Sequence, residues 1–160
     1  IHDFDIARWI LDEPVETLYA TGSCLVDKAI ATAGDIDTAS VTMRTASGKI
    51  AIITNSRRAV YGYDQRIEAF GSGGMLQAMN NCETNLVHSG ENGVTSEVPL
   101  HFFLERYEAA YRNELIDFVN ALQNNTAPLA NHLDGVASLQ LAEAANASLT
   151  SGAAVSVDQF

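Results

Sequence analysis

The sequence predicts an α+β fold in which an open, mostly antiparallel β-sheet carries helices packed on one face. Three observations support this: short β-branched runs fill the middle of the chain, long stretches with helical period follow them, and the two patterns do not alternate. The chain has 160 residues, of which 47% are hydrophobic, enough to bury a core. We therefore expect residues 1–160 to form a single domain.

The first predicted element is a helix over residues 1–11. Its apolar residues recur at helical spacing, and a proline shortly afterwards ends it, because the residue before a proline is pushed out of the helical region. We expect one apolar face that combines His2, Ile6, Trp9 and Ile10.

Short β-branched runs then predict six or seven strands in one sheet. In the second run, Ala39, Val41 and Met43 alternate with polar residues, which predicts one buried and one polar face. Turn signals at 47–48, 71–74 and 89–93 predict hairpins. The expected strands cover 15–26, 37–45, 49–57, 63–70 with a return strand through Met75 and Leu76, 83–88 and 94–98, and a short edge strand near 153–157.

Two helices are predicted after Pro99. An apolar stripe from Leu104 to Leu122 indicates a helix of about six turns, which the segment 124–128 ends. For the second helix we expect Asp134 as the N-cap and Gly152 as the stop signal.

Charge and composition exclude several classes of protein. With 9 basic and 20 acidic residues the formal charge is −11, whereas binding nucleic-acid phosphates requires a basic surface. No apolar run is long enough to span a membrane. Cys24 and Cys82 show no metal-ligand or redox spacing, so we interpret them as free thiols, buried in a cytoplasmic protein.

His2 is the most informative candidate, and spacing alone leaves two interpretations open. It is either a packing residue or a functional imidazole that Asp5, three positions along the helix, orients. No histidine has metal-like spacing, so no metal site is predicted. The segment 55–64 gathers Asn, Arg, Tyr and Asp and is either a hydroxyl-recognising loop or a plain loop with Tyr61 and Tyr63 half-buried.

Three blocks, IHDFDIARWIL at 1–11, NSRRAVYGYDQRIEAFGSGGML at 55–76 and HFFLERYEAAYRNELIDFV at 101–119, resemble one known family. In this order they are similar to the C-terminal domains of inositol 2-dehydrogenases in the glucose-fructose oxidoreductase/inositol dehydrogenase/MocA family. The resemblance extends over essentially the whole chain. It implies oxidation of a polyol, myo-inositol above all, by hydride transfer to NAD.

The resemblance also implies residue roles and partners. His2 matches the family's catalytic histidine, whose Asp partner would precede Ile1, and Tyr63 matches a position that approaches the polyol hydroxyls. NAD would bind an N-terminal Rossmann domain that these residues do not include, so we expect the isolated chain to be inactive. The sheet would mediate homodimers or homotetramers. The alternative is a free-standing, non-catalytic sugar-binding or oligomerisation module of the same fold.

Overall fold

The computed structural model describes residues 1–160, and contacts within the chain gather into two units. Unit 1 consists of Ile1–Arg58 and Ala130–Phe160, and unit 2 consists of Ala59–Leu129. The single domain expected from the sequence stays a prediction.

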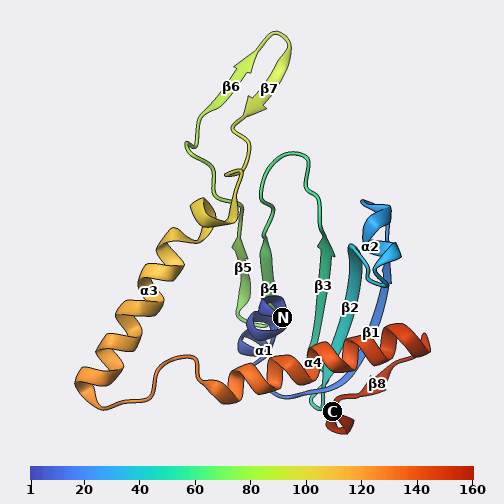
Figure 1. The fold of residues 1–160 in the computed structure, drawn as a ribbon. Helices are drawn as coiled ribbons and strands as arrows, with labels where there is room; N and C mark the ends of the chain where they lie inside the picture. The colour runs from blue at the N-terminus through green and yellow to red at the C-terminus, as the bar shows by residue number, and fades with distance from the viewer. The chain divides into compact units, whose positions relative to one another are not determined.

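Unit 1 is built on a four-stranded antiparallel sheet (Figure 1). A tight turn joins its second and third strands, and Gly48 occupies the left-handed φ of 91° that this turn needs. The predicted edge strand is confirmed, because β8 pairs with β1 at the rim of the sheet. In the order β3-β2-β1-β8, the strands are β1 (Val15–Ser23), β2 (Thr38–Thr45), β3 (Ile50–Ser56) and β8 (Val155–Ser156).

Two helices, α1 (His2–Leu11) and α4 (His132–Ser151), cover one face of this sheet. Side chains of both helices join the alternating inward residues of β1 and β2 in one core. Leu18, Met43 and Leu141 are almost inaccessible to solvent, and each such side chain contributes about 1.5–3 kcal/mol through burial. Unit 1 also contains the short helix α2 (Lys28–Thr32), which the sequence did not predict, and the 3-10 turn η1 (Val157–Gln159).

The α1 helix forms as predicted, but its predicted apolar face is wrong. Trp9 is 81% exposed, Ile10 is 38% exposed, and His2 is exposed as well. The face that packs on the core consists of Phe4, Ala7 and Leu11, which have the same helical spacing. The sheet and α4 supply the partners that decide between the two stripes, and spacing within α1 does not contain that information.

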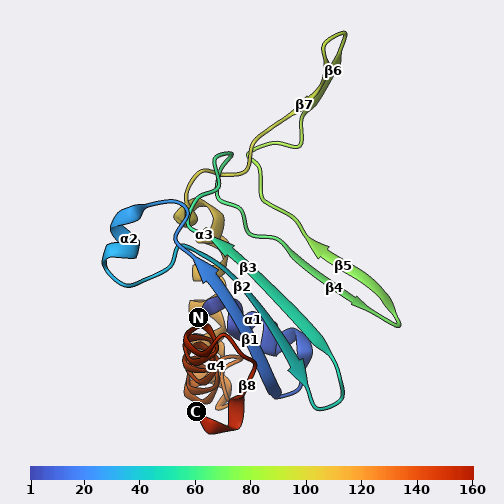
Figure 2. The same cartoon turned by 90° about the vertical axis from the view of Figure 1, so that its right-hand side faces the viewer.

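Unit 2 holds the remaining strands and one long helix. Its strands form two separate hairpins, β4–β5 and β6–β7, which connecting segments of the chain join in Figure 2. The expectation of one continuous sheet is therefore wrong: the eight strands form three sheets. The segments 63–66 and 83–86 are also not strands. The elements are β4 (Ile67–Gly71), β5 (Gly74–Ala78), β6 (Val87–Gly90), β7 (Gly93–Ser96) and α3 (Phe103–Asn124).

Both long helices occur where the sequence predicts them. The N-cap of α4 is Asn131, and Asp134 instead occupies the third helical position and bonds back to the Asn131 N–H at 2.9 Å. This reciprocal arrangement is a capping box, so the prediction of Asp134 as N-cap is wrong by three residues. Gly152 ends α4 in the left-handed conformation as expected. None of the helices combines the length and apolar character that crossing a bilayer requires.

Candidate functional site

His2 is the first helical residue of α1 and faces solvent. Its imidazole has no hydrogen-bond or ion-pair partner within the chain, so both ring nitrogens are open to a ligand. The expectation that Asp5 orients His2 is wrong, because the Asp5 carboxylate lies against Arg8 at 3.4 Å and against the Ser138 hydroxyl at 3.2 Å. Nothing in the chain therefore fixes the tautomer of His2.

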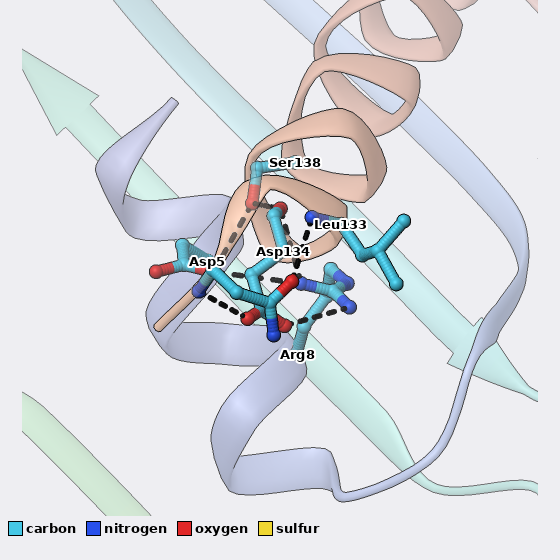
Figure 3. A network of polar contacts seen from close by, with 6 residues as sticks. Asp5, Arg8, Leu133, Asp134 and Ser138 are labelled. Carbon is cyan, nitrogen blue, oxygen red and sulfur yellow. Dashed lines mark hydrogen bonds and ion pairs between the residues drawn. The ribbon is translucent and has the colours of Figure 1, made fainter. Parts of the chain in front are cut away.

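The helix that carries His2 is fastened to the first turn of α4 (Figure 3). Arg8 bridges the two helices: Nη1 lies 3.4 Å from Asp5 Oδ1 and 3.4 Å from the Asp134 carbonyl oxygen. A second guanidinium nitrogen lies 3.9 Å from the Asp134 carboxylate. The Ser138 hydroxyl reaches both helices, 2.8 Å from the Asp134 carbonyl oxygen and 3.2 Å from Asp5. These contacts hold the inner face of α1 and leave the His2 face free.

A further contact ties the start of α1 to β3. Asn55, near the end of β3, donates its side-chain amide to Asp3 Oδ2 at 3.0 Å. The polar segment 55–64 therefore begins beside the turn of α1 that carries His2. Asn55 serves here as a structural anchor, which the sequence did not reveal because the two residues are 52 positions apart.

Tyr63 lies in unit 2, in the irregular segment before β4. Its backbone N–H donates to the Leu100 carbonyl at 2.8 Å, and its half-buried ring meets the Tyr107 ring edge-on with centroids 5.7 Å apart. The neighbouring Gly62 has a φ of 135°, and a Cβ there would lie 2.5 Å from the Pro99 carbonyl oxygen, so glycine is required for this approach. The Tyr63 hydroxyl has no partner within the chain. It is therefore free to bond a ligand.

Asp64 is the centre of a polar network in unit 2. Its Oδ1 accepts from Arg66 Nε at 2.8 Å and from Asn80 Nδ2 at 2.6 Å, and its Oδ2 accepts from Arg66 Nη2 at 2.9 Å and from the Tyr61 hydroxyl. The hydrogen bonds from Arg66 and Tyr61 hold the pKa of Asp64 well below its usual range. In turn, the hydrogen bond to Asp64 raises the pKa of Tyr61.

The sequence singled out the segment that contains Tyr61, Tyr63 and Asp64, but not this network. Arg66 falls just outside the segment, and Asn80 lies 16 residues from Asp64 across the β4–β5 hairpin. Hairpin pairing would have been needed to find it. His2 belongs to unit 1 and Tyr63 to unit 2.

The cysteines and the histidines form no metal centre. No group of three or more His, Cys, Asp or Glu residues is placed to hold a metal ion. Cys24 and Cys82 are free, as predicted, and both are partly rather than fully buried. Desolvation and a hydrogen bond to Asp37 raise the pKa of the Cys24 thiol, which disfavours the reactive thiolate.

Over almost its whole length, the chain is similar to part of several inositol dehydrogenases. Residues 1–77 match the family model described as GFO/IDH/MocA C-terminal domain. A myo-inositol 2-dehydrogenase of Thermotoga maritima is 47% identical over 99% of the chain, and an inositol 2-dehydrogenase of Rhizobium meliloti is 46% identical over 98%. The match covers 48% of each relative, so the chain spans about half the length of the curated relatives it matches.

Solved structures agree with this assignment. A probable dehydrogenase from Thermotoga maritima superposes with a TM-score of 0.96 at 46% identity, covering 99% of this chain and 48% of that one. A scyllo-inositol dehydrogenase from Lactobacillus casei, solved with NAD(H) and scyllo-inositol, has a TM-score of 0.87 at 27% identity, covering 98% and 46%. The family resemblance and the α+β fold expected from the sequence are confirmed.

Proposed function

The chain belongs to the GFO/IDH/MocA C-terminal domain family, and on that premise we propose that it forms the substrate-binding half of an NAD-dependent polyol dehydrogenase. The proposed substrate is myo-inositol, oxidised at a secondary alcohol to a ketone. The observation that carries the proposal is the match to inositol dehydrogenases over 98–99% of the chain.

The proposed base is His2, which takes the proton of the reacting hydroxyl. Its free imidazole nitrogens on a solvent-facing helical turn support this role, since imidazole is the side chain best suited to accept a proton near neutral pH. The bracing of α1 by Arg8 and Asp134 supports it further, because a base acts efficiently only when its backbone is held in place.

Tyr63 is the proposed contact to a polyol hydroxyl. Its ring is held by the edge-on packing against Tyr107 and by the backbone bond to Leu100, while its hydroxyl is unused within the chain. A tyrosine hydroxyl can donate to or accept from an alcohol, so one such group orients a polyol without requiring charge.

The residues of this chain do not fit a dinucleotide site. All its strand pairs are antiparallel, whereas the dinucleotide-binding turn opens the helix of a parallel β-α-β unit. We therefore assign NAD to a domain outside residues 1–160. When NAD⁺ is bound there, its nicotinamide ring would accept the hydride from the substrate.

Self-association through the uncovered face of the four-stranded sheet is part of the proposal. On this face Tyr19, Thr42 and Ile52 stand in one cross-strand row, with Ile50 on the same side. Ile50 is 64% exposed and Ile52 is 66% exposed, an unusual position for large apolar strand residues. A homodimer or homotetramer would bury them. A cytoplasmic location is also proposed, since both cysteines are free thiols.

The direct test supplies the full-length polypeptide with NAD⁺ and each of several inositols and sugars, and follows NADH formation. We expect turnover with myo-inositol and at most weak turnover with sugars. Binding of a polyol to the full-length polypeptide without any NADH would instead favour the non-catalytic module. Turnover by residues 1–160 alone would contradict the assignment of NAD to another domain.

A further inference from the structure

Asp64 has no capacity left to bind a ligand directly. A carboxylate offers about four acceptor positions, and Asp64 uses all of them on Tyr61, Arg66 and Asn80. Its side chain is 17% exposed, whereas that of Arg66 is 57% exposed. The members of this network that are exposed to solvent are therefore Tyr61 and Arg66.

The network also fixes what those outer members offer. A tyrosine hydroxyl has one proton, and the proton of Tyr61 is committed to Asp64, so its oxygen can only accept from a ligand. Arg66 has five N–H groups, of which two are used on Asp64, so it still donates. Both side chains lie against the same Asp64 oxygen, which places an acceptor beside a donor.

An acceptor beside a donor matches an alcohol, which donates one hydrogen bond and accepts others. A carboxylate or phosphate would meet the lone pair of Tyr61 without a proton to share, and the positive charge of Arg66 is already compensated by Asp64. The arrangement therefore favours a neutral hydroxyl group over an anionic one.

From this geometry we infer that Asp64 is a positioning residue that fixes Tyr61 as acceptor and Arg66 as donor for a hydroxyl of the polyol. The inference rests on the proposed function for the identity of the ligand. It assigns unit 2 a second hydroxyl contact besides Tyr63. It also gives a role to Asn80, whose side-chain amide donates to Asp64 and completes the hydrogen bonding of the carboxylate. The side-chain oxygen of Asn80 also accepts from the Gln65 N–H at 2.8 Å and so holds the loop to the end of β5.

The test is a double-mutant cycle in the full-length protein with myo-inositol. Asp64→Asn and Tyr61→Phe should each raise KM about fivefold, the worth of one hydrogen bond, with kcat within about twofold of wild type. Because Asp64 acts partly through Tyr61, the Asp64→Asn effect on KM should be smaller in the Tyr61→Phe background, and what remains there is the part that acts through Arg66. Additive effects on KM, or a loss confined to kcat, would overturn the inference.

A matched control removes the same charge from the same unit. Glu68, on β4, is exposed and bonds only to Gln77 at 2.8 Å, so Glu68→Gln should leave KM unchanged. If Glu68→Gln raises KM as much as Asp64→Asn does, the loss of one negative charge from unit 2 explains the effect and the inference fails.

A spectroscopic measurement separates this inference from the proposed function. The hydrogen bond to Asp64 raises the pKa of the Tyr61 phenol, so Asp64→Asn should shift one tyrosine titration to lower pH, and that titration should be absent in Tyr61→Phe. If the wild-type protein oxidises no polyol, the proposed function fails while this titration still decides how Asp64 holds Tyr61. An unchanged tyrosine titration in Asp64→Asn overturns the inference.

Discussion

In this molecule a single polar side chain can supply the hydrogen-bond partner of a backbone group at the point where the neighbouring strand ends. Ser148 on α4 is fully buried, accepts the Ala20 N–H at 2.9 Å and donates to the Ala153 carbonyl at 2.6 Å. β8 pairs with β1 only at Thr17 and Leu18. The Ala20 N–H, two residues further along β1, therefore has no strand partner on this side and donates to Ser148 instead. One hydroxyl thus replaces the strand that has ended.

Replacement of Ser148 by alanine should therefore destabilise unit 1. The buried Ala20 N–H would lose its partner, at a cost of about 1–3 kcal/mol in the free energy of unfolding. Chemical denaturation followed by circular dichroism measures this. Thr150→Ala, which removes an exposed hydroxyl from the same helix, is the control and should be close to neutral. Equal effects of the two substitutions would refute the role given to Ser148.

At the scale of elements, one carboxylate organises the loop between β1 and α2. Asp37 is 6% exposed and accepts from the backbone N–H groups of residues 25–27 at 2.8–3.0 Å, and from the Thr38 hydroxyl at 2.9 Å. Burial pushes the pKa of Asp37 up, but those backbone hydrogen bonds outweigh it and hold the pKa well below its usual range. The ionised form is thus the one that the folded loop stabilises.

The lowered pKa of Asp37 predicts a pH-dependent contribution to stability. A group with a lowered folded-state pKa stabilises above the pKa of the unfolded chain, about 4, and loses that effect as pH falls toward its folded-state pKa. Asp37→Asn should lower the melting temperature at neutral pH, and the difference from wild type should shrink steadily below about pH 4. Asp35→Asn, an exposed neighbour with the same charge change, should show little effect. A pH-independent difference would contradict this.

The sequence predicted most elements but not how they assemble. Helical period and turn residues are local signals, and they located α1, α3, α4 and the hairpins within a few residues. Which apolar face of α1 packs on the core, the predicted one with Ile6 and Trp9 or the observed one with Phe4 and Leu11, depends on contacts with residues far along the chain. The division of the strands into three sheets depends on such contacts as well. The same limit applies to the site: Tyr61 and Asp64 stand in one visible segment, whereas Asn80 joins them only through the hairpin.

At the scale of the whole molecule, the uncovered sheet face predicts self-association. Ile52→Asp places a charge at the β3 end of the row formed with Tyr19 and Thr42, so it should shift the full-length protein to monomers in sedimentation. Val60→Asp, at an 88% exposed position outside this sheet, is the matched control and should leave the assembly intact. An oligomer that survives Ile52→Asp with unchanged stability would exclude this face as the interface.

The central claim is that this chain supplies the base of a polyol dehydrogenase, and the rate of the His2→Ala variant tests it most directly. His2 is exposed and makes no side-chain contact that folding needs, so circular dichroism of the full-length variant should match wild type. NADH formation from myo-inositol should fall by about two orders of magnitude or more. A folded His2→Ala protein that oxidises myo-inositol at the wild-type rate would contradict the account.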